Sequence, residues 1–259
     1  MIERVLLTFS FLAVTCSVQA AWDVGAGLED YRWKEYPTNI SGTPRESGTR
    51  AALFVNWTQE GNGALFAWRA KLYGGTVNYD TFQMNAPYDP VSTKTDYNGA
   101  ASEGQFYYRT NIGSRKMDYL VGLGLDAWRR SIRNSGGDQI EDYSIWFMRA
   151  GLRLGKSRNE AGLHGELGLK YPVSTRENAH LDSMSYTSNP KLSPKGAISG
   201  YAEIGYRINA RFDVIGYYDS WRFRQSADVM ATNTSGISYY IYQPKSNMDA
   251  LGAKLLVSF

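Results

Sequence analysis

His180 is the side chain in this sequence whose surroundings come closest to an acid–base site. It opens the segment His180-Leu181-Asp182-Ser183, and an earlier polar stretch contains Asp80, Asp89 and Asp96. A histidine close to carboxylates can activate water for hydrolysis near neutral pH. A hydrolase site centred on His180 is therefore an alternative, provided that the loops bring the histidine and these aspartates together.

The second histidine and the single cysteine offer less chemistry. His164 lies two residues from Glu166, within an alternating polar and apolar stretch, where a structural hydrogen bond is the simpler interpretation. Cys16, near the N-terminus, is the only cysteine of the chain. A segment without further cysteines and with two isolated histidines is a poor source of metal ligands. We expect no metal site and no cofactor.

Residues 1–20 have the pattern of a secretory signal peptide, with Arg4 before a short apolar run. The small residues of Val18-Gln19-Ala20 predict cleavage after Ala20, with Ala21 as the alternative. An uncleaved N-terminal membrane anchor and a lipoprotein modification at Cys16 remain open, although Thr15 is a poor residue before a lipidated cysteine. We expect residues 21–259 to form a single domain.

The charge and hydropathy of the chain narrow its class. The formal net charge is +3 and the basic residues are dispersed, which does not favour nucleic acid as a partner. After the leader, no apolar run is long enough for a transmembrane helix. The domain is therefore either soluble or crosses a membrane as β-strands.

Stretches rich in Tyr, Trp, Val and Leu recur between clusters of Gly, Asn, Ser and Pro. They predict ten strands, near 22–34, 48–58, 64–78, 103–112, 116–130, 140–155, 160–173, 196–208, 211–224 and 245–259. Short and long connections alternate between them, as in outer-membrane barrels. The predicted fold is all-β, a single antiparallel up-and-down transmembrane barrel, with eight or twelve strands as alternatives.

Each predicted strand has one apolar face and one face rich in glycine and charge. In 160–173, for example, Leu163, Leu167 and Leu169 alternate with His164 and Glu166. The glycine-rich charged faces suit a crowded lumen, so we place the apolar faces against lipid, while a secreted soluble barrel is the alternative. Aromatic residues gather at strand ends, toward the short turns and toward the long connections, where Phe106 and Trp146 fall. The predicted membrane-interface set is Trp22, Trp57, Phe66, Trp146, Tyr206, Phe212 and Phe259.

The inward faces collect basic and acidic residues in nearly equal number. The expected polar network of the lumen consists of Glu29, Arg69, Lys71, Arg109, Asp126, Arg149, Arg153, His164, Glu166, Glu203, Arg207 and Lys254. Charges inside a narrow barrel must pair, and we expect bridges from Arg149 to Glu166 and from Glu29 to Lys254. A ten-stranded interior is only slightly wider than one that side chains fill, which predicts a largely plugged lumen with at most a small ion path.

The last strand, Leu251 to Phe259, presents alternate apolar residues and ends on an aromatic residue. It resembles the closing strand of Gram-negative outer-membrane β-barrel proteins. The resemblance implies export by a Sec-type route, insertion into the outer membrane, recognition of this strand by the outer-membrane assembly machinery, and contact with outer-membrane lipid and lipopolysaccharide. A monomer is expected by default.

The strand number and the loop positions of His180 and the aspartates also invite comparison with omptins, ten-stranded outer-membrane proteases. The order His180-x-Asp182 is the reverse of the omptin Asp-x-His, and the second long connection has no close pair of aspartates. Nor does the chain show the lipid-facing His and Ser of lipid A deacylases. We therefore expect a structural, surface-interaction or minor channel role. An omptin-like protease or lipid-modifying enzyme is the alternative.

Overall fold

The computed structural model describes residues 19–38, 42–61, 63–82, 90–112, 115–134, 137–155 and 161–259. The leader predicted over 1–20 thus lies almost entirely outside the described residues. Ten long strands form the body of the molecule: β1 (Gln19–Tyr36), β2 (Arg45–Glu60), β3 (Ala64–Phe82), β4 (Pro90–Ile112), β5 (Arg115–Ile132), β6 (Gln139–Gly155), β7 (Gly162–His180), β10 (Ser199–Arg207), β11 (Phe212–Arg224) and β14 (Lys245–Ser258).

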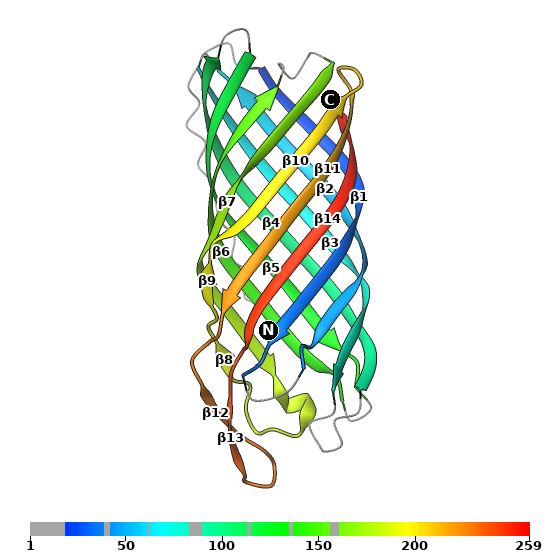
Figure 1. Cartoon of the computed structure of the whole chain (residues 1–259), viewed down its shortest axis with the longest axis vertical. Helices are drawn as coiled ribbons and strands as arrows, with labels where there is room; N and C mark the ends of the chain where they lie inside the picture. Colours follow the sequence, from blue (N-terminus) through cyan, green and yellow to red (C-terminus); the bar gives the residue numbers. More distant parts are fainter. Residues whose placement is uncertain are drawn as a thin grey trace.

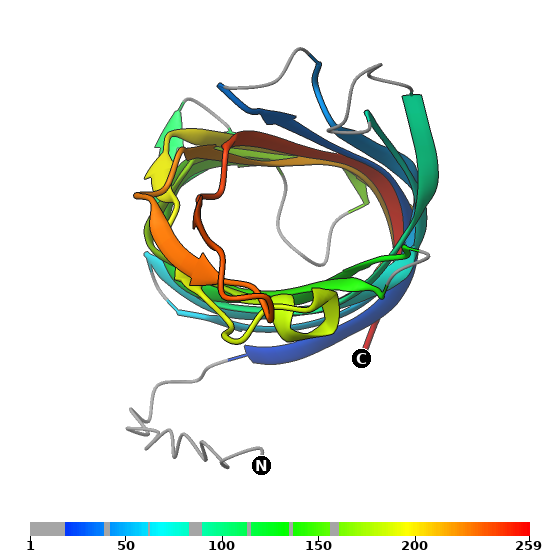
Figure 2. The same ribbon diagram turned by 90° about the horizontal axis from the view of Figure 1, so that it is seen from below.

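Every one of these strands pairs antiparallel with two neighbours, so the sheet closes on itself. Strands β1 to β7 follow each other in order, β7 pairs with β10, and β14 pairs with both β11 and β1. Figure 2 shows the resulting ring, seen along the barrel. The predicted ten-stranded antiparallel barrel is confirmed, and the counts of eight and twelve strands are wrong.

The long connections gather at one end of the barrel, opposite the C-terminus (Figure 1). They carry the short elements η1 (Leu181–Met184), β8 (Lys191–Leu192), β9 (Lys195–Ala197), β12 (Val229–Thr232) and β13 (Ser238–Ile241). We call this the long-connection end and the other the short-turn end. Within the described residues, no helix is long and apolar enough to cross a membrane.

The outer face of the strands changes character along the barrel axis. From the short-turn end it exposes large apolar side chains, which we call the apolar band; its members include Val24, Leu28, Leu53, Leu72, Val121, Leu123, Met148, Leu167, Ile204, Leu251 and Leu255. Toward the long-connection end the same face becomes polar, with Asp30 following two residues after Leu28. This outer polar belt includes Arg32, Lys34, Arg45, Asp96, Arg129, Arg133, Asp142, Arg222 and Asp249.

A soluble barrel would bury its apolar face and expose its charges, whereas this barrel does the reverse over the height of the apolar band. Leu28 is 61% exposed, and its chain neighbour Glu29 is 1% exposed. The arrangement is that of a transmembrane barrel, with lipid outside and a polar interior. Trp22, Trp57, Phe66, Tyr206, Phe212 and Phe259 lie on the outer face at the short-turn end, and Trp146 lies beside Ser174 at the opposite boundary of the band.

The strands are longer than the sequence indicates. The segment 79–102, expected as a long connection, is mostly strand, because β3 runs to Phe82 and β4 begins at Pro90. Part of the expected connection 174–195 likewise belongs to β7. Placing Phe106 toward the long connections is therefore wrong: it pairs with Phe66 near the short turns, since β4 starts 13 residues earlier than expected.

The closing seam between β1 and β14 requires close approach of two backbones. A Cβ atom built on Gly25 would lie 2.1 Å from the carbonyl oxygen of Leu255. We predict that Gly25→Val forces the two strands apart and destabilises the folded barrel by about 1–3 kcal/mol. The loss is measured by heating samples to increasing temperatures before gel electrophoresis. The variant should shift from the migration of the folded barrel to that of the unfolded chain at a lower temperature than the native protein.

Gly104→Val is the matched control, because the nearest atom to a Cβ there is Phe66 Cζ at 3.8 Å. This variant should unfold at the temperature of the native chain. Equal destabilisation by both substitutions would show that the seam is not the sensitive place.

Candidate functional site

The inner face carries its charges in layers stacked along the barrel axis. The layer nearest the short turns is built around two aspartates. Asp118 accepts hydrogen bonds from Arg109 Nε at 2.9 Å and from Arg153. Asp213 contacts His164 Nε2 at 2.9 Å and accepts a hydrogen bond from Arg207 at 2.7 Å. Each carboxylate thus faces two nitrogen-bearing side chains.

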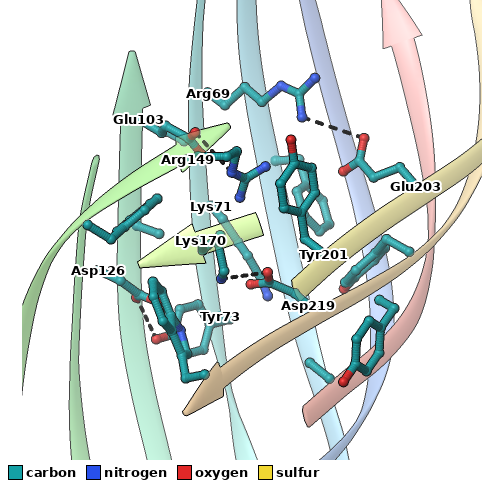
Figure 3. A pocket seen from close by; sticks show the side chains of 18 of the residues that line it. Arg69, Lys71, Tyr73, Glu103, Asp126, Arg149, Lys170, Tyr201, Glu203 and Asp219 are labelled. Atoms are coloured by element: carbon teal, nitrogen blue, oxygen red, sulfur yellow. Dashed lines mark hydrogen bonds and ion pairs between the residues drawn. The ribbon is translucent and has the colours of Figure 1, made fainter. Parts of the chain in front are cut away.

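The middle layer joins opposite walls of the barrel. Arg69 donates to Glu166 at 2.9 Å and lies 3.5 Å from Glu203, which also accepts from Lys254 at 2.7 Å. Arg149 Nε lies 3.0 Å from Glu103. The pairs bring side chains of β3, β7, β10 and β14 together across the lumen, and Figure 3 shows Arg69 and Glu203 facing each other.

A third layer lies toward the long-connection end. Glu29 accepts from Arg50 and from Lys71, each at 2.5 Å. Lys170 Nζ lies 2.5 Å from Asp219 and 3.5 Å from the centre of the Trp221 ring. Asp126 accepts from Tyr73 at 2.8 Å and from Trp221. Lys170 is 2% exposed, and Figure 3 shows it directed toward Asp219.

Two small cavities occupy the spaces between these layers. The inner cavity, of about 120 Å³, lies between the middle and third layers and is lined by Lys71, Asp126 and Lys170 among others. The short-turn cavity, also about 120 Å³, is lined by Asp118, His164 and Asp213 among others. Both are lined by Asn56, Arg69, Glu203 and Lys254. The cavities therefore meet at the ion pairs of the middle layer.

An aromatic lid closes the inner face beyond the third layer. We define it by the buried rings of Trp33, Tyr97, Trp128 and Tyr143. Trp128 and Tyr143 stack with ring centres 4.9 Å apart, and the Trp33 ring meets Tyr143 edge-on at 5.5 Å. The guanidinium of Arg130 lies 4.3 Å from the centre of the Trp33 ring.

Arg130 is the cation at the centre of an acidic cluster beside the lid. It lies 2.8 Å from Glu35, 3.0 Å from Glu46 and 3.0 Å from Glu141. Glu177 is buried beside them, and its Oε2 has no hydrogen-bond partner within the described residues. Burial disfavours the charged carboxylate and, together with the negative charge of Glu141, raises the pKa of Glu177 well above its usual value.

The twelve residues expected to form the lumen network all line the inside of the barrel, distributed over these three layers. Arg149 lies 3.8 Å from Glu166, at the limit of an ion pair, and contacts Glu103 more closely. The expected pair of Glu29 with Lys254 is wrong. Their registers differ by two residues, since Glu29 faces Gly252, and Glu29 is occupied by Arg50 and Lys71.

His180 does not meet the loop aspartates expected beside it. It is the last residue of β7, its Nε2 lies 2.8 Å from Asp142 on the outer polar belt, and Arg129 also donates to Asp142. Asp96 lies on β4, three strands away from β7, and contacts Arg133, which directly follows β5. Asp80 accepts from Ser92, and Asp89 lies outside the described residues.

The aromatic lid and its acidic cluster were missed by the sequence reasoning. Some of these residues lie where β1, β2, β4 and β7 continue beyond the expected strand ends. The others lie inside the expected strands, on inner faces whose contacts across the lumen the sequence does not give. The signal was present as an unbroken alternation, for example Tyr31-x-Trp33-x-Glu35. Within the described residues, no group of three His, Cys, Asp or Glu side chains is arranged to hold a metal ion.

Comparison with known proteins identifies the fold and goes no further. No protein-family model and no curated protein matches the chain. The outer-membrane protease OmpT from Escherichia coli is similar in structure, with a TM-score of 0.57 and 12% identity over 96% of this chain and 99% of that one. Also found were the Pseudomonas putida toluene transporter TodX (TM-score 0.40, 9% identity, 92% and 89% covered) and Neisserial surface protein A (0.36, 12%, 92% and 99%).

The buried Glu177 predicts a dependence of stability on pH. A carboxyl group whose pKa is higher in the folded chain makes folding less favourable as pH rises above its unfolded value of about 4.3. Glu177→Gln removes this penalty. We therefore expect the variant to gain stability relative to the native chain by on the order of 1 kcal/mol more at pH 8 than at pH 5.

Asp96→Asn is the comparison variant, because the hydrogen bonds from Arg133 hold the pKa of Asp96 below its usual value and no histidine contacts it among the described residues. The charged carboxylate contributes its full stabilisation above about pH 4. The variant should therefore lose the same free energy of unfolding at pH 5 and at pH 8. Urea unfolding of both variants in micelles at the two pH values measures the difference. A Glu177→Gln effect that is the same at pH 5 and pH 8 contradicts the account.

Proposed function

We propose that the chain is an integral outer-membrane protein whose lumen is a narrow ion path, closed at rest by paired charges. The fold, the apolar band and the polar interior support a position in the outer membrane. One observation supports the path: two cavities lined by charged groups meet at the middle layer and are separated there by ion pairs.

The barrier at the middle layer is of a kind that can open, which favours an ion path rather than a permanently plugged lumen. Side chains of the barrel wall close the middle layer, and Arg69 has two alternative carboxylates, Glu166 at 2.9 Å and Glu203 at 3.5 Å. An exchange between these partners needs only rotamer changes, and Glu166 keeps Arg149 as a nearby cation at 3.8 Å. Lys254 remains with Glu203 throughout. A purely structural lumen could be filled as stably by apolar side chains.

The aromatic lid is the second barrier on this path. Tyr31 and Tyr97 are joined by a hydrogen bond of 3.2 Å, and both lie over the guanidinium of Arg50. The lid rings narrow the lumen toward the long-connection end, so the proposed conductance is small and brief. A solute larger than a hydrated ion does not fit cavities of about 120 Å³.

A hydrolase using His180 finds no support in this geometry. The imidazole lies on the outer polar belt between Asp142 and Asn178, and the described carboxylates of the second long connection lie on other strands. We therefore do not retain this alternative as the proposed function.

Planar-bilayer recording tests the path directly. The double variant Glu203→Ala/Lys254→Ala removes two lumen ion pairs, Glu203 with Lys254 and Glu203 with Arg69, without changing net charge, and it merges the two cavities. We expect the native barrel to give rare, small openings, and the double variant to open several times more often.

Arg129→Ala/Asp142→Ala is the matched control, since it removes an ion pair of 2.7 Å from the outer polar belt. It should conduct like the native chain. A large, stable conductance of the native barrel, or identical recordings from the native barrel and the lumen variant, would refute the proposal.

A further inference from the structure

On one side of β7, the ladder of strand hydrogen bonds is interrupted over residues 171–176. Strand β7 pairs with β10 as far as Lys170, which faces Ser199. Beyond it Pro172 has no N–H to donate, and the register with β6 shifts so that Val173 bulges outward. The neighbouring strand β9 pairs with β11 and not with β7.

This interruption leaves a hollow on the outer surface, the seam groove, of about 550 Å³. It is lined by residues 171–176, residues 193–198 and Arg224. At its short-turn side it exposes Tyr171, Val173 and Ile198, which continue the apolar band. At its long-connection side it exposes Arg176, Lys195 and Arg224. The groove therefore spans the boundary between the band and the polar belt.

The cations of the groove differ from the other arginines of the outer polar belt. Five of those arginines each lie within 4 Å of an aspartate, namely Arg32 with Asp30, Arg45 with Asp80, Arg129 with Asp142, Arg133 with Asp96 and Arg222 with Asp249. Among the described residues, Arg176, Lys195 and Arg224 have no ion pair or hydrogen bond to a carboxylate, and no acidic side chain lines the groove.

Two of these cations also oppose each other directly. Arg224 and Lys195 are register partners on β11 and β9. Like charges at directly opposed positions of a sheet destabilise the pairing. An anion bound between them would turn this repulsion into two favourable contacts, and a phosphate accepts the paired N–H groups of arginine well.

We propose that the seam groove binds the phosphorylated headgroup of an outer-leaflet glycolipid of the lipopolysaccharide type. Arg176, Lys195 and Arg224 hold the phosphate, while Tyr171, Val173 and Ile198 contact the adjoining acyl chains. Such a lipid presents phosphate directly above hydrocarbon, which is the order of cations and apolar side chains in the groove. This inference rests on the proposed outer-membrane location and not on an ion path through the lumen.

The test measures binding of diphosphorylated lipid A to the folded barrel in detergent by native mass spectrometry. The groove variant is Arg176→Gln/Lys195→Gln/Arg224→Gln. The matched control, Arg32→Gln/Arg129→Gln/Arg133→Gln, removes three positive charges from the same belt away from the groove. We expect the groove variant to bind about tenfold more weakly or worse, and the control to stay within about threefold of the native chain.

Arg224→Asp separates a lost site from a misfolded barrel. It places a carboxylate opposite Lys195, so it should raise the unfolding temperature and still weaken lipid A binding. Dephosphorylated lipid A should bind weakly to every variant, and inorganic phosphate at millimolar concentration should not compete. Equal losses in the groove variant and the control, or full competition by inorganic phosphate, would overturn the proposal. Neither result bears on the conductance of the lumen.

Discussion

Pairing of every backbone group within the wall is the constraint on which the structure depends. Lipid offers no hydrogen-bond partner to a strand edge, so a membrane-spanning sheet must close on itself. Here the pairs β1–β14 and β7–β10 complete the ring. Closure gives every strand one face toward lipid and one toward the lumen, and the side-chain alternation follows. Charged residues on the inner face then have no bulk water, and must find partners across the barrel.

The layers of the lumen and the outer polar belt obey the same rule of charge pairing at different depths. Inside, Glu29 and Asp118 each contact two cations. Removing one of these cations would leave part of a buried negative charge uncompensated. Outside, arginines and aspartates pair where water is available. At the seam groove the pairing of β7 with the chain that follows it is interrupted beyond Lys170. There Arg176, Lys195 and Arg224 lie together beside an apolar surface, with no acidic partner among the described residues.

Alternation was sufficient to predict the barrel, the ten strands and the inward position of residues such as Arg69 and Lys254. It was insufficient for register, because neighbouring strands slide by two residues without changing any face. For that reason Glu29 was assigned to Lys254 when it meets Arg50 and Lys71. A polar outer face also resembles a loop, so the predicted strand over 64–78 ends at Asn78, where β3 continues to Phe82. Tyr97 of the aromatic lid falls in an expected connection for this reason, and the contacts of Trp33 with Trp128 and Tyr143 depend on the register that alternation leaves open.

A lumen closed by ion pairs should keep water-soluble reagents out of the inner cavity, and the reactivity of a cysteine placed there measures this directly. Ala101 lines the inner cavity and Ser235 is exposed beyond the barrel. With Cys16→Ser in every variant, Ala101→Cys in nanodiscs should react with a charged thiol reagent at least about tenfold more slowly than Ser235→Cys, because the charge layers obstruct the reagent. Equal reaction rates at the two positions would show that the lumen is open, and would contradict the account.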